Sequence, residues 1–311
     1  MLPGRLPAET PGETLQFYLH LDRARIPSDG MKQVFLILLL VASVWGQAPS
    51  NAPASSSDSA STSTAAPAAV SLDQENARKA KEVLEQAIQA LGGDAYLNLR
   101  NRHIEGRSFS FYHGRATSNG VLFWGFTEYP DKERVEVTKE RDVAYIYSGD
   151  KGFEITYKGA HPMENKDLVD YLRRRKFGLD RILRTWVNDP TVALFFDGQA
   201  IAEQQPALKV TLINAKNEAV TLFFDQDSHV PIKKTFKWRD PIDHQNNVED
   251  EVYYNYRVVQ GINTAYGFTR YYNGDMASQR SLNAAFYNEN LNESMFDPNS
   301  NYNPNKPSGK H

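Results

Sequence analysis

The sequence contains no cysteine. This absence excludes disulfide bonds, thiol catalysis, cysteine-ligated metals and anchoring through a lipidated N-terminal cysteine. The chain also lacks an excess of one charge, because 35 Lys and Arg against 38 Asp and Glu give a formal net charge of −3. The sequence therefore carries no electrostatic footprint for nucleic acid or for an anionic membrane surface.

Long hydrophobic runs are also scarce, and the one that stands out lies within Met31–Gly46 (MKQVFLILLLVASVWG). Lys32 precedes its apolar core, Val34–Val44. This core is well short of the roughly 20 residues that span a bilayer, so we expect no transmembrane segment in the mature chain. The layout is typical of a secretory signal peptide over 31–46, with cleavage after Gly46. Residues 1–30 are then expected to be a mis-annotated N-terminal extension.

Cleavage would deliver a soluble, periplasmic protein with three parts. Residues 47–70 are an Ala/Ser/Pro-rich stretch without large apolar side chains, and we expect a disordered linker there. The segment 71–297 is long enough to bury its own core and is expected to fold as one domain. Residues 298–311 are polar and Pro-rich and are expected to be a disordered tail.

The pattern predicts that the domain opens with a helix. Ser71 and Gln74 fit a capping box, and Gly92-Gly93 supplies a stop signal. The apolar positions between them recur at helical spacing: Ala77, Ala80, Leu84, Ala87, Ile88 and Leu91. The opposite side is densely charged, so the helix is expected to rest on a larger element through one stripe.

Alternating apolar residues and short turns then predict a long antiparallel meander. A helical interruption over 163–187 divides it, with Gly178 as a possible break. About 11 strands and two or three helices indicate an α+β fold, a large curved antiparallel sheet with helices covering its concave face. Arg173–Lys176 forms a basic cluster on the interruption. A solvated helix face and a docking patch for an acidic partner or lipid headgroup both explain that cluster.

Several loose motifs resemble those of the LolA-like superfamily of periplasmic lipoprotein carriers. They span nearly the whole expected domain: Ala90–Gly93 with Ile104–Gly106, Gly120–Leu122 with Tyr129-Pro130, Ser148–Phe153, Phe224–Pro231, and Asn288–Pro298. The resemblance implies an incomplete β-barrel whose hydrophobic cavity is closed by helices. In the carriers of that family an arginine before the second-strand proline ties down the helical lid. Here Tyr129 holds that position, so the same latch is not expected.

Aromatic residues on both parities of several strands indicate either cover on both faces of the sheet or a cavity on one. We expect the ligand-binding residues to be Phe109, Phe111, Leu122, Trp124, Phe126, Val135, Val137, Phe153, Leu222, Phe224, Phe236, Trp238, Tyr254 and Tyr256. The expected lid residues are Leu168, Leu172, Leu179, Ile182, Leu183 and Trp186. A packed core under the helices explains the same pattern, and the two interpretations stay open.

Enzymatic signatures are weak. The histidines are scattered without zinc-binding spacing, and the sequence has neither a Gly-x-Ser-x-Gly elbow nor a phosphate-binding glycine loop. Asp225, Asp227 and His229, like Asp240, Asp243 and His244, fall in predicted turns, whose polar chemistry explains them. We expect no catalytic residues, no metal and no cofactor.

The sequence therefore predicts an exported bacterial cell-envelope protein that binds a hydrophobic ligand, such as an acyl chain, a lipid or a lipoprotein moiety, in a half-barrel cavity. Lipid or lipoprotein trafficking is the expected setting. The alternative is a periplasmic sensor or scaffold that binds an envelope protein partner through the same sheet, without transport. A hydrolase is a third and weaker hypothesis.

Overall fold

A computed structural model describes residues 71–305 of the chain. The predicted extension, signal peptide and linker over residues 1–70 lie outside the described residues, as does the end of the predicted tail. Those predictions remain predictions from the sequence.

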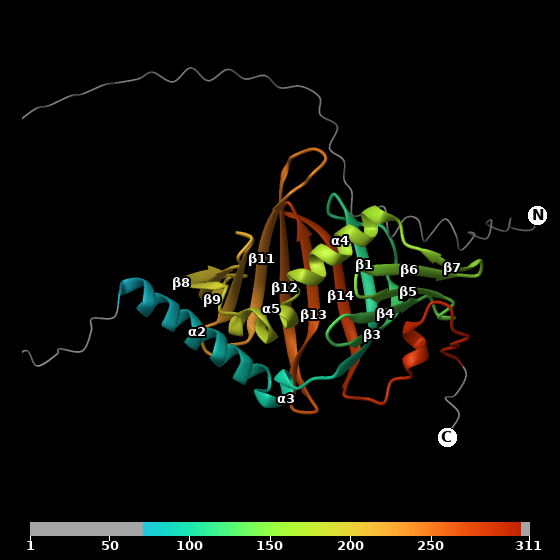
Figure 1. Cartoon of the computed structure of the whole chain (residues 1–311), viewed down its shortest axis with the longest axis horizontal. Helices are drawn as coiled ribbons and strands as arrows, with labels where there is room; N and C mark the ends of the chain where they lie inside the picture. Colours follow the sequence, from blue (N-terminus) through green and yellow to red (C-terminus); the bar gives the residue numbers. More distant parts are fainter. Residues whose placement is uncertain (1–70, 306–311) are drawn as a thin grey trace, which may run out of the picture. The chain divides into compact units, whose positions relative to one another are not determined.

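The described residues form one antiparallel sheet of 14 strands (Figure 1). In chain order the strands are β1 (Asn101–Tyr112), β2 (Arg115–Ala116), β3 (Val121–Glu128), β4 (Lys132–Val137), β5 (Val143–Ser148), β6 (Lys151–Thr156), β7 (Gly159–Pro162), β8 (Ala193–Ala202), β9 (Gln205–Ile213), β10 (Ala219–Asp225), β11 (Pro231–Arg239), β12 (Asn246–Val259), β13 (Ile262–Tyr272) and β14 (Asp275–Tyr287). Their spatial order is β7-β6-β5-β4-β3-β1-β14-β13-β12-β11-β10-β9-β8, with β2 paired to β1 alone. The two end strands β7 and β8 do not pair with each other, so the sheet stays open.

The α+β class is confirmed, but the expected strand number of about 11 was wrong. The pattern missed β2, β7 and β8 for physical reasons. β2 has only 2 residues, and β7 reads Gly-Ala-His-Pro, which lacks any apolar alternation. β8 is interrupted by Gly198, where its register with β9 shifts.

The helices are α2 (Leu72–Leu91), α3 (Asp94–Leu97), α4 (Asn165–Lys176) and α5 (Leu179–Arg184), with short 3-10 turns η1 (Trp186–Asn188) and η2 (Glu293–Phe296). The predicted opening helix is confirmed as α2, and the interruption does divide at Gly178, between α4 and α5. We call the side of the sheet that carries α2, α4 and α5 the helix face, and the opposite side the outer face.

The main core lies on the helix face, between α2, α5 and the strands near β8. The buried stripe of α2 comprises Ala80, Val83, Leu84, Ala87, Ile88 and Leu91. It packs with Val210, Leu212, Val220, Leu222, Phe224 and Phe236 from β9, β10 and β11. The one-stripe helix expected from the sequence therefore covers only this end of the sheet.

The outer face carries a second, smaller core at the opposite end of the sheet. The segment after β14 crosses this face, and its Met295 and Phe296 bury Phe126 of β3. Part of the segment expected to be a disordered tail belongs to it: Tyr302 packs on this cluster, and Asn305 donates a hydrogen bond to the Glu140 carbonyl at 2.8 Å. The ordered domain thus extends past residue 297.

Candidate functional site

The predicted ligand-binding residues do not lie on one face of the sheet. Val135, Val137, Leu222, Phe224, Phe236, Trp238 and Tyr256 belong to the helix face. Phe109, Phe111, Leu122, Trp124, Phe126, Phe153 and Tyr254 belong to the outer face. A single cavity lined by the whole set is therefore not formed, because residues of opposite parity point away from each other across the sheet.

The outer-face residues of β3 form a packed core. Phe126 is buried, and Trp124 packs on the same cluster beneath Met295, Phe296 and Tyr302. A buried ion pair closes this core: Arg134 Nε donates to Glu136 Oε1 at 2.6 Å, and Glu136 is 0% exposed. For these positions the packed-core interpretation, left open by the sequence, describes the structure.

Two predicted lid residues, Leu168 and Leu172, lie on α4, and neither is buried; the helix contains no buried residue at all. The other four, Leu179, Ile182, Leu183 and Trp186, join the main core through α5 and η1. The predicted lid is therefore two different elements. α5 and η1 are core elements, whereas α4 covers the sheet without burying its apolar residues beneath it.

Polar contacts and ring stacking attach α4 to the strands. Tyr171 donates a hydrogen bond to Glu133 Oε2 at 2.7 Å and stacks on Tyr147 with ring centroids 3.4 Å apart. Burial, with Glu133 next, raises the pKa of Tyr171, so this hydroxyl stays a donor. Arg175 donates to the carbonyls of Asp131 at 3.1 Å and Gly149 at 2.5 Å.

The basic cluster Arg173–Lys176 fits neither interpretation offered by the sequence. Arg173 pairs with Asp170 at 2.7 Å and lies 4.0 Å from the Trp238 ring centroid. Lys176 pairs with Glu218 at 2.5 Å. Because these cations already hold partners within the domain, the cluster is part of the α4 attachment, not a patch of free charges.

The sheet beneath α4 is lined by half-buried apolar side chains on β1, β4, β13 and β14. These are Ile104, Val135, Phe268 and Leu282. They share the helix face with the half-buried Leu168 and Leu172 of α4. Apolar side chains that remain partly exposed under a covering helix are the usual lining of a ligand site. We take this surface, the α4-covered face, as the candidate site.

Buried charges border the α4-covered face on β11 and β12. Lys234 is 0% exposed, donates to the Phe177 carbonyl at 2.6 Å and pairs with Glu251, which also accepts a hydrogen bond from Tyr253 at 2.5 Å. Glu249 is 1% exposed, burial raises the pKa of its carboxyl group, and its Oε1 has no partner among the described residues. The border is thus polar, whereas the surface that it encloses is largely apolar.

A second polar network fixes α5 next to this surface. Asp180 of α5 accepts hydrogen bonds from Tyr129 at 2.6 Å, Tyr96 at 3.0 Å and Arg102 at 3.0 Å. Burial acts to raise the pKa of Asp180, but Arg102 and the two tyrosine hydroxyls outweigh it, and the pKa falls below its ordinary value.

This network ties the helical segment to the sheet at the position where the sequence predicted no arginine latch. The arginine of the family's latch is absent, yet Tyr129 itself joins the turn before Pro130 to α5. Sequence reasoning missed Asp180, because an aspartate in the first turn of a helix is ordinarily explained by its favourable interaction with the helix dipole.

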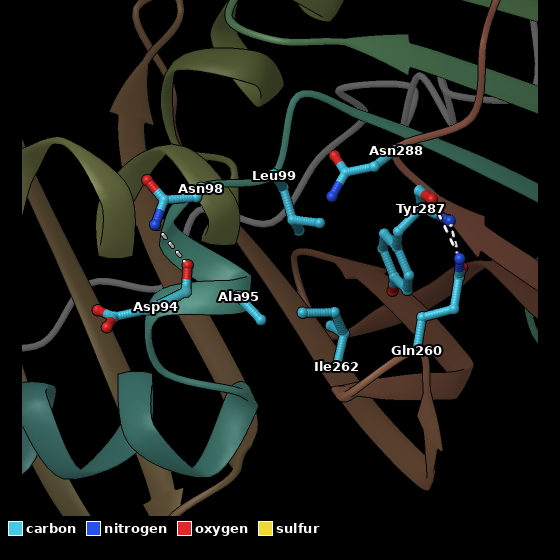
Figure 2. A pocket seen from close by; sticks show the side chains of 8 residues that line it. All are labelled: Asp94, Ala95, Asn98, Leu99, Gln260, Ile262, Tyr287 and Asn288. Atoms are coloured by element: carbon cyan, nitrogen blue, oxygen red, sulfur yellow. Dashed lines mark hydrogen bonds between the residues drawn. The ribbon is translucent and has the colours of Figure 1, made fainter.

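The described residues form two recesses, the first away from the predicted residues and the second against two of them, Phe236 and Trp238. Figure 2 shows a groove of about 480 Å³ between α3, the β12–β13 turn and the end of β14. Its amide side chains are engaged with the chain itself: Gln260 bonds both backbone groups of Tyr287, and Asn98 bonds the Asp94 carbonyl. A cavity of about 540 Å³ lies at the C-terminal end of α4, against Phe177, Phe236 and Trp238.

Comparison with solved structures shows the fold. A DUF1329 family protein from Desulfovibrio piger aligns over 71% of this chain and 97% of its own, with 8% identity and a TM-score of 0.51. An outer membrane lipoprotein-sorting protein domain from Vibrio parahaemolyticus (72% and 98% covered, 11% identity, TM-score 0.48) and a LolA superfamily protein from Nitrosomonas europaea (70% and 96% covered, 13% identity, TM-score 0.45) also match. No family model and no curated protein sequence matches the chain. At 8% identity the likeness concerns the fold alone, and the chain shares that fold with the DUF1329 family protein.

Two searches of the described residues bear on function. No helix over residues 71–305 has the length and apolar character needed to cross a bilayer. The same part of the chain contains no cluster of acidic and histidine side chains arranged to hold a metal ion.

Proposed function

We propose that this chain is an exported protein of the bacterial cell envelope that binds an amphiphile, such as an acyl chain or lipid, between α4 and the sheet. Its role is binding, not catalysis, and its place is the periplasm. The signal-peptide pattern over residues 31–46 supports export.

The observation that carries the proposal is the contrast between α4 and the other covering elements. α2, α5 and η2 all bury apolar residues against the sheet, whereas α4 has no buried residue and is attached by polar contacts and the stacking of Tyr171 on Tyr147. An apolar surface whose side chains stay half-exposed beneath a covering helix offers contacts to an apolar guest. Displacing water from it supplies the binding free energy, at about 25 cal/mol per Å² of apolar surface.

The test is saturable binding of a neutral fluorescent amphiphile to the purified domain, residues 71–311, compared in two variants. Leu282→Trp enlarges a half-buried leucine on the helix face, and Leu122→Trp makes the same change to a half-buried leucine on the outer face. Only the first should weaken probe binding, by about tenfold or more if the added ring occupies the ligand's volume. The proposal would be overturned if both variants weakened probe binding equally, or if the wild-type protein bound no probe.

Export has a separate test. Expression of the full chain in a bacterial host should yield a mature N-terminus near Gln47. An unprocessed chain that retains Val34–Val44 would contradict the periplasmic assignment, whatever the outcome of the binding assay.

One observation favours the alternative, a sensor or scaffold for a protein partner. β8 is an end strand of the sheet, and it exposes two large apolar side chains, Phe195 at 44% and Ile201 at 72%. Asn76 of α2 bonds both backbone groups of Phe196, and the rest of this apolar edge strand is a template for pairing with another chain. If the wild-type protein binds no probe, the sensor or scaffold function becomes the better-supported of the two proposals.

A further inference from the structure

Arg280 lies in the middle of the α4-covered face. It belongs to β14, between β1 and β13, where it pairs with Ser108 on one side and Phe268 on the other. Its guanidinium lies 5.5 Å from the ring centroid of Phe123, whose side chain shares the helix face. The position is thus at the centre of the sheet, surrounded by the apolar residues assigned above to the ligand.

Arg280 has no hydrogen bond and no ion pair with any residue in the described range, 71–305. Two carboxylates on this side are engaged: Glu133 accepts from Tyr171, and Glu251 accepts from Tyr253 and pairs with Lys234. Phe123 is the one ring that Arg280 approaches within the same range. A guanidinium carries five donors in a fixed fork and no acceptor, so an unpaired one is suited to bind an anion.

The surroundings of Arg280 favour an anion. The side chain is exposed to solvent. Protein atoms around the guanidinium nevertheless lower its pKa, and this burial is the largest cause of the shift. Arg270 and Arg174 lower that pKa further by repulsion, and the carboxylates of Glu133 and Glu251 act against them. An anion bound to Arg280 would offset the repulsion that Arg270 and Arg174 exert on it.

We propose that Arg280 recognises the anionic headgroup of the bound amphiphile, so that the ligand class is a single-headed acyl carboxylate or acyl phosphate. This inference rests on the proposed function and specifies its ligand. Arginine suits the task because its planar fork binds a carboxylate or a phosphate through two parallel hydrogen bonds. The apolar side chains of Phe123, Phe268 and Leu282 next to it would contact the start of the acyl chain.

The experiment measures displacement of the neutral probe by three amphiphiles of one chain length: dodecanoate, dodecyl phosphate and the neutral monododecanoyl glycerol. It is run at pH 8, where both acids are ionised. Wild type should bind at least one of the two anions about tenfold or more tightly than the neutral ligand, since hydrogen bonds to charged groups are strong. Which anion binds more tightly distinguishes a fatty-acid ligand from a phosphorylated lipid.

Arg280→Gln should abolish this preference and leave affinity for the neutral ligand within about twofold. Arg280→Lys should retain part of it, because a lysine keeps the charge and loses the fork. Arg107→Gln is the matched control: Arg107 pairs with Ser281, the next residue of β14, and points to the outer face, so its removal should change no affinity.

The outcomes separate the two proposals. Neutral and anionic amphiphiles that bind equally well, or a preference that survives in Arg280→Gln, would overturn the role of Arg280 while amphiphile binding stands. A wild type that binds none of the three ligands would overturn both.

Discussion

The network around Asp180 allows one sharp prediction about what fixes the helical segment to the sheet. In Asp180→Asn the carboxylate that accepts from Arg102, Tyr129 and Tyr96 is lost, and the Arg102 guanidinium keeps its charge without that partner. Removing one member of a buried pair costs about 3–5 kcal/mol. The two side chains retain 24% and 32% exposure, so solvent screening lowers the expected loss to about 2–4 kcal/mol of unfolding free energy.

The pH dependence of that loss identifies its cause. The pKa of Asp180 is lowered in the folded protein from its ordinary value of 3.8. The carboxylate therefore contributes stability that is fully present above the unfolded-state pKa and is lost as the pH falls through the lower folded-state pKa. The stability difference between wild type and Asp180→Asn should be constant near neutral pH and should narrow once the pH drops below about 4.

Urea unfolding of both proteins at a series of pH values measures this difference directly. Asp189→Asn is the control, because Asp189 is fully exposed and its pKa is lowered by bonds to Thr191 within its own turn. A cost in Asp180→Asn that does not change with pH would show that the loss is steric. An unaltered stability would show that the network does not hold α5.

Two further predictions concern packing. Leu84→Ala, at a 0% exposed position of α2, should cost about 2–5 kcal/mol of stability in thermal or denaturant unfolding, whereas Glu85→Ala on the charged side should change it by less than about 0.5 kcal/mol. Similar losses in both would mean that the buried stripe is misassigned. Trp124→Ala should lower the unfolding free energy by up to about 3–5 kcal/mol, the cost for a fully buried Trp. Because Trp124 is only half-buried, the loss should fall toward the lower end of that range, and probe binding should stay intact. Weaker binding without destabilisation would contradict the assignment of Trp124 to that core.

Local patterns predicted most of the elements. The apolar spacing of α2, the break at Gly178 and the alternation in β3, β5 and β10 each reflect contacts that the residue's own element makes with the core. β7 and β8 were not predicted from the sequence, because end strands are paired on one side only and their sequences are therefore less constrained.

The face of each strand could not be predicted in the same way. Alternation shows that Leu122, Trp124 and Phe126 share a side of β3, but it does not say which side carries the helices. That choice depends on the segment after β14, more than 150 residues further along the chain, whose Met295 and Phe296 pack on β3 and leave α4 to the other side. Because the covering residues lie so far along the chain, the local alternation in β3 does not show which of its faces they cover.

Arg280 shows the same limit for a functional residue. It stands between Gln279 and Ser281 in a polar strand, where an arginine side chain is ordinarily expected to be exposed to solvent without a specific role. Its significance comes from what the fold brings near it, namely Arg174 from α4 and Arg270 from β13, and from the carboxylates engaged by Tyr171 and Lys234. Only the sheet order, which places β14 between β1 and β13, assembles that environment.

The two faces of the sheet thus differ in the kind of cover that they carry, and this difference favours the helix face as the binding side. On the outer face Met295 and Phe296 exclude water at 2% and 5% exposure, so opening that cover would expose apolar surface. On the helix face α4 is attached by hydrogen bonds, an ion pair and the stacking of Tyr171 on Tyr147, and the net contribution of the polar contacts is small because water replaces them when they open. The proposed ligand would therefore enter beneath α4 at less cost than along the outer-face core.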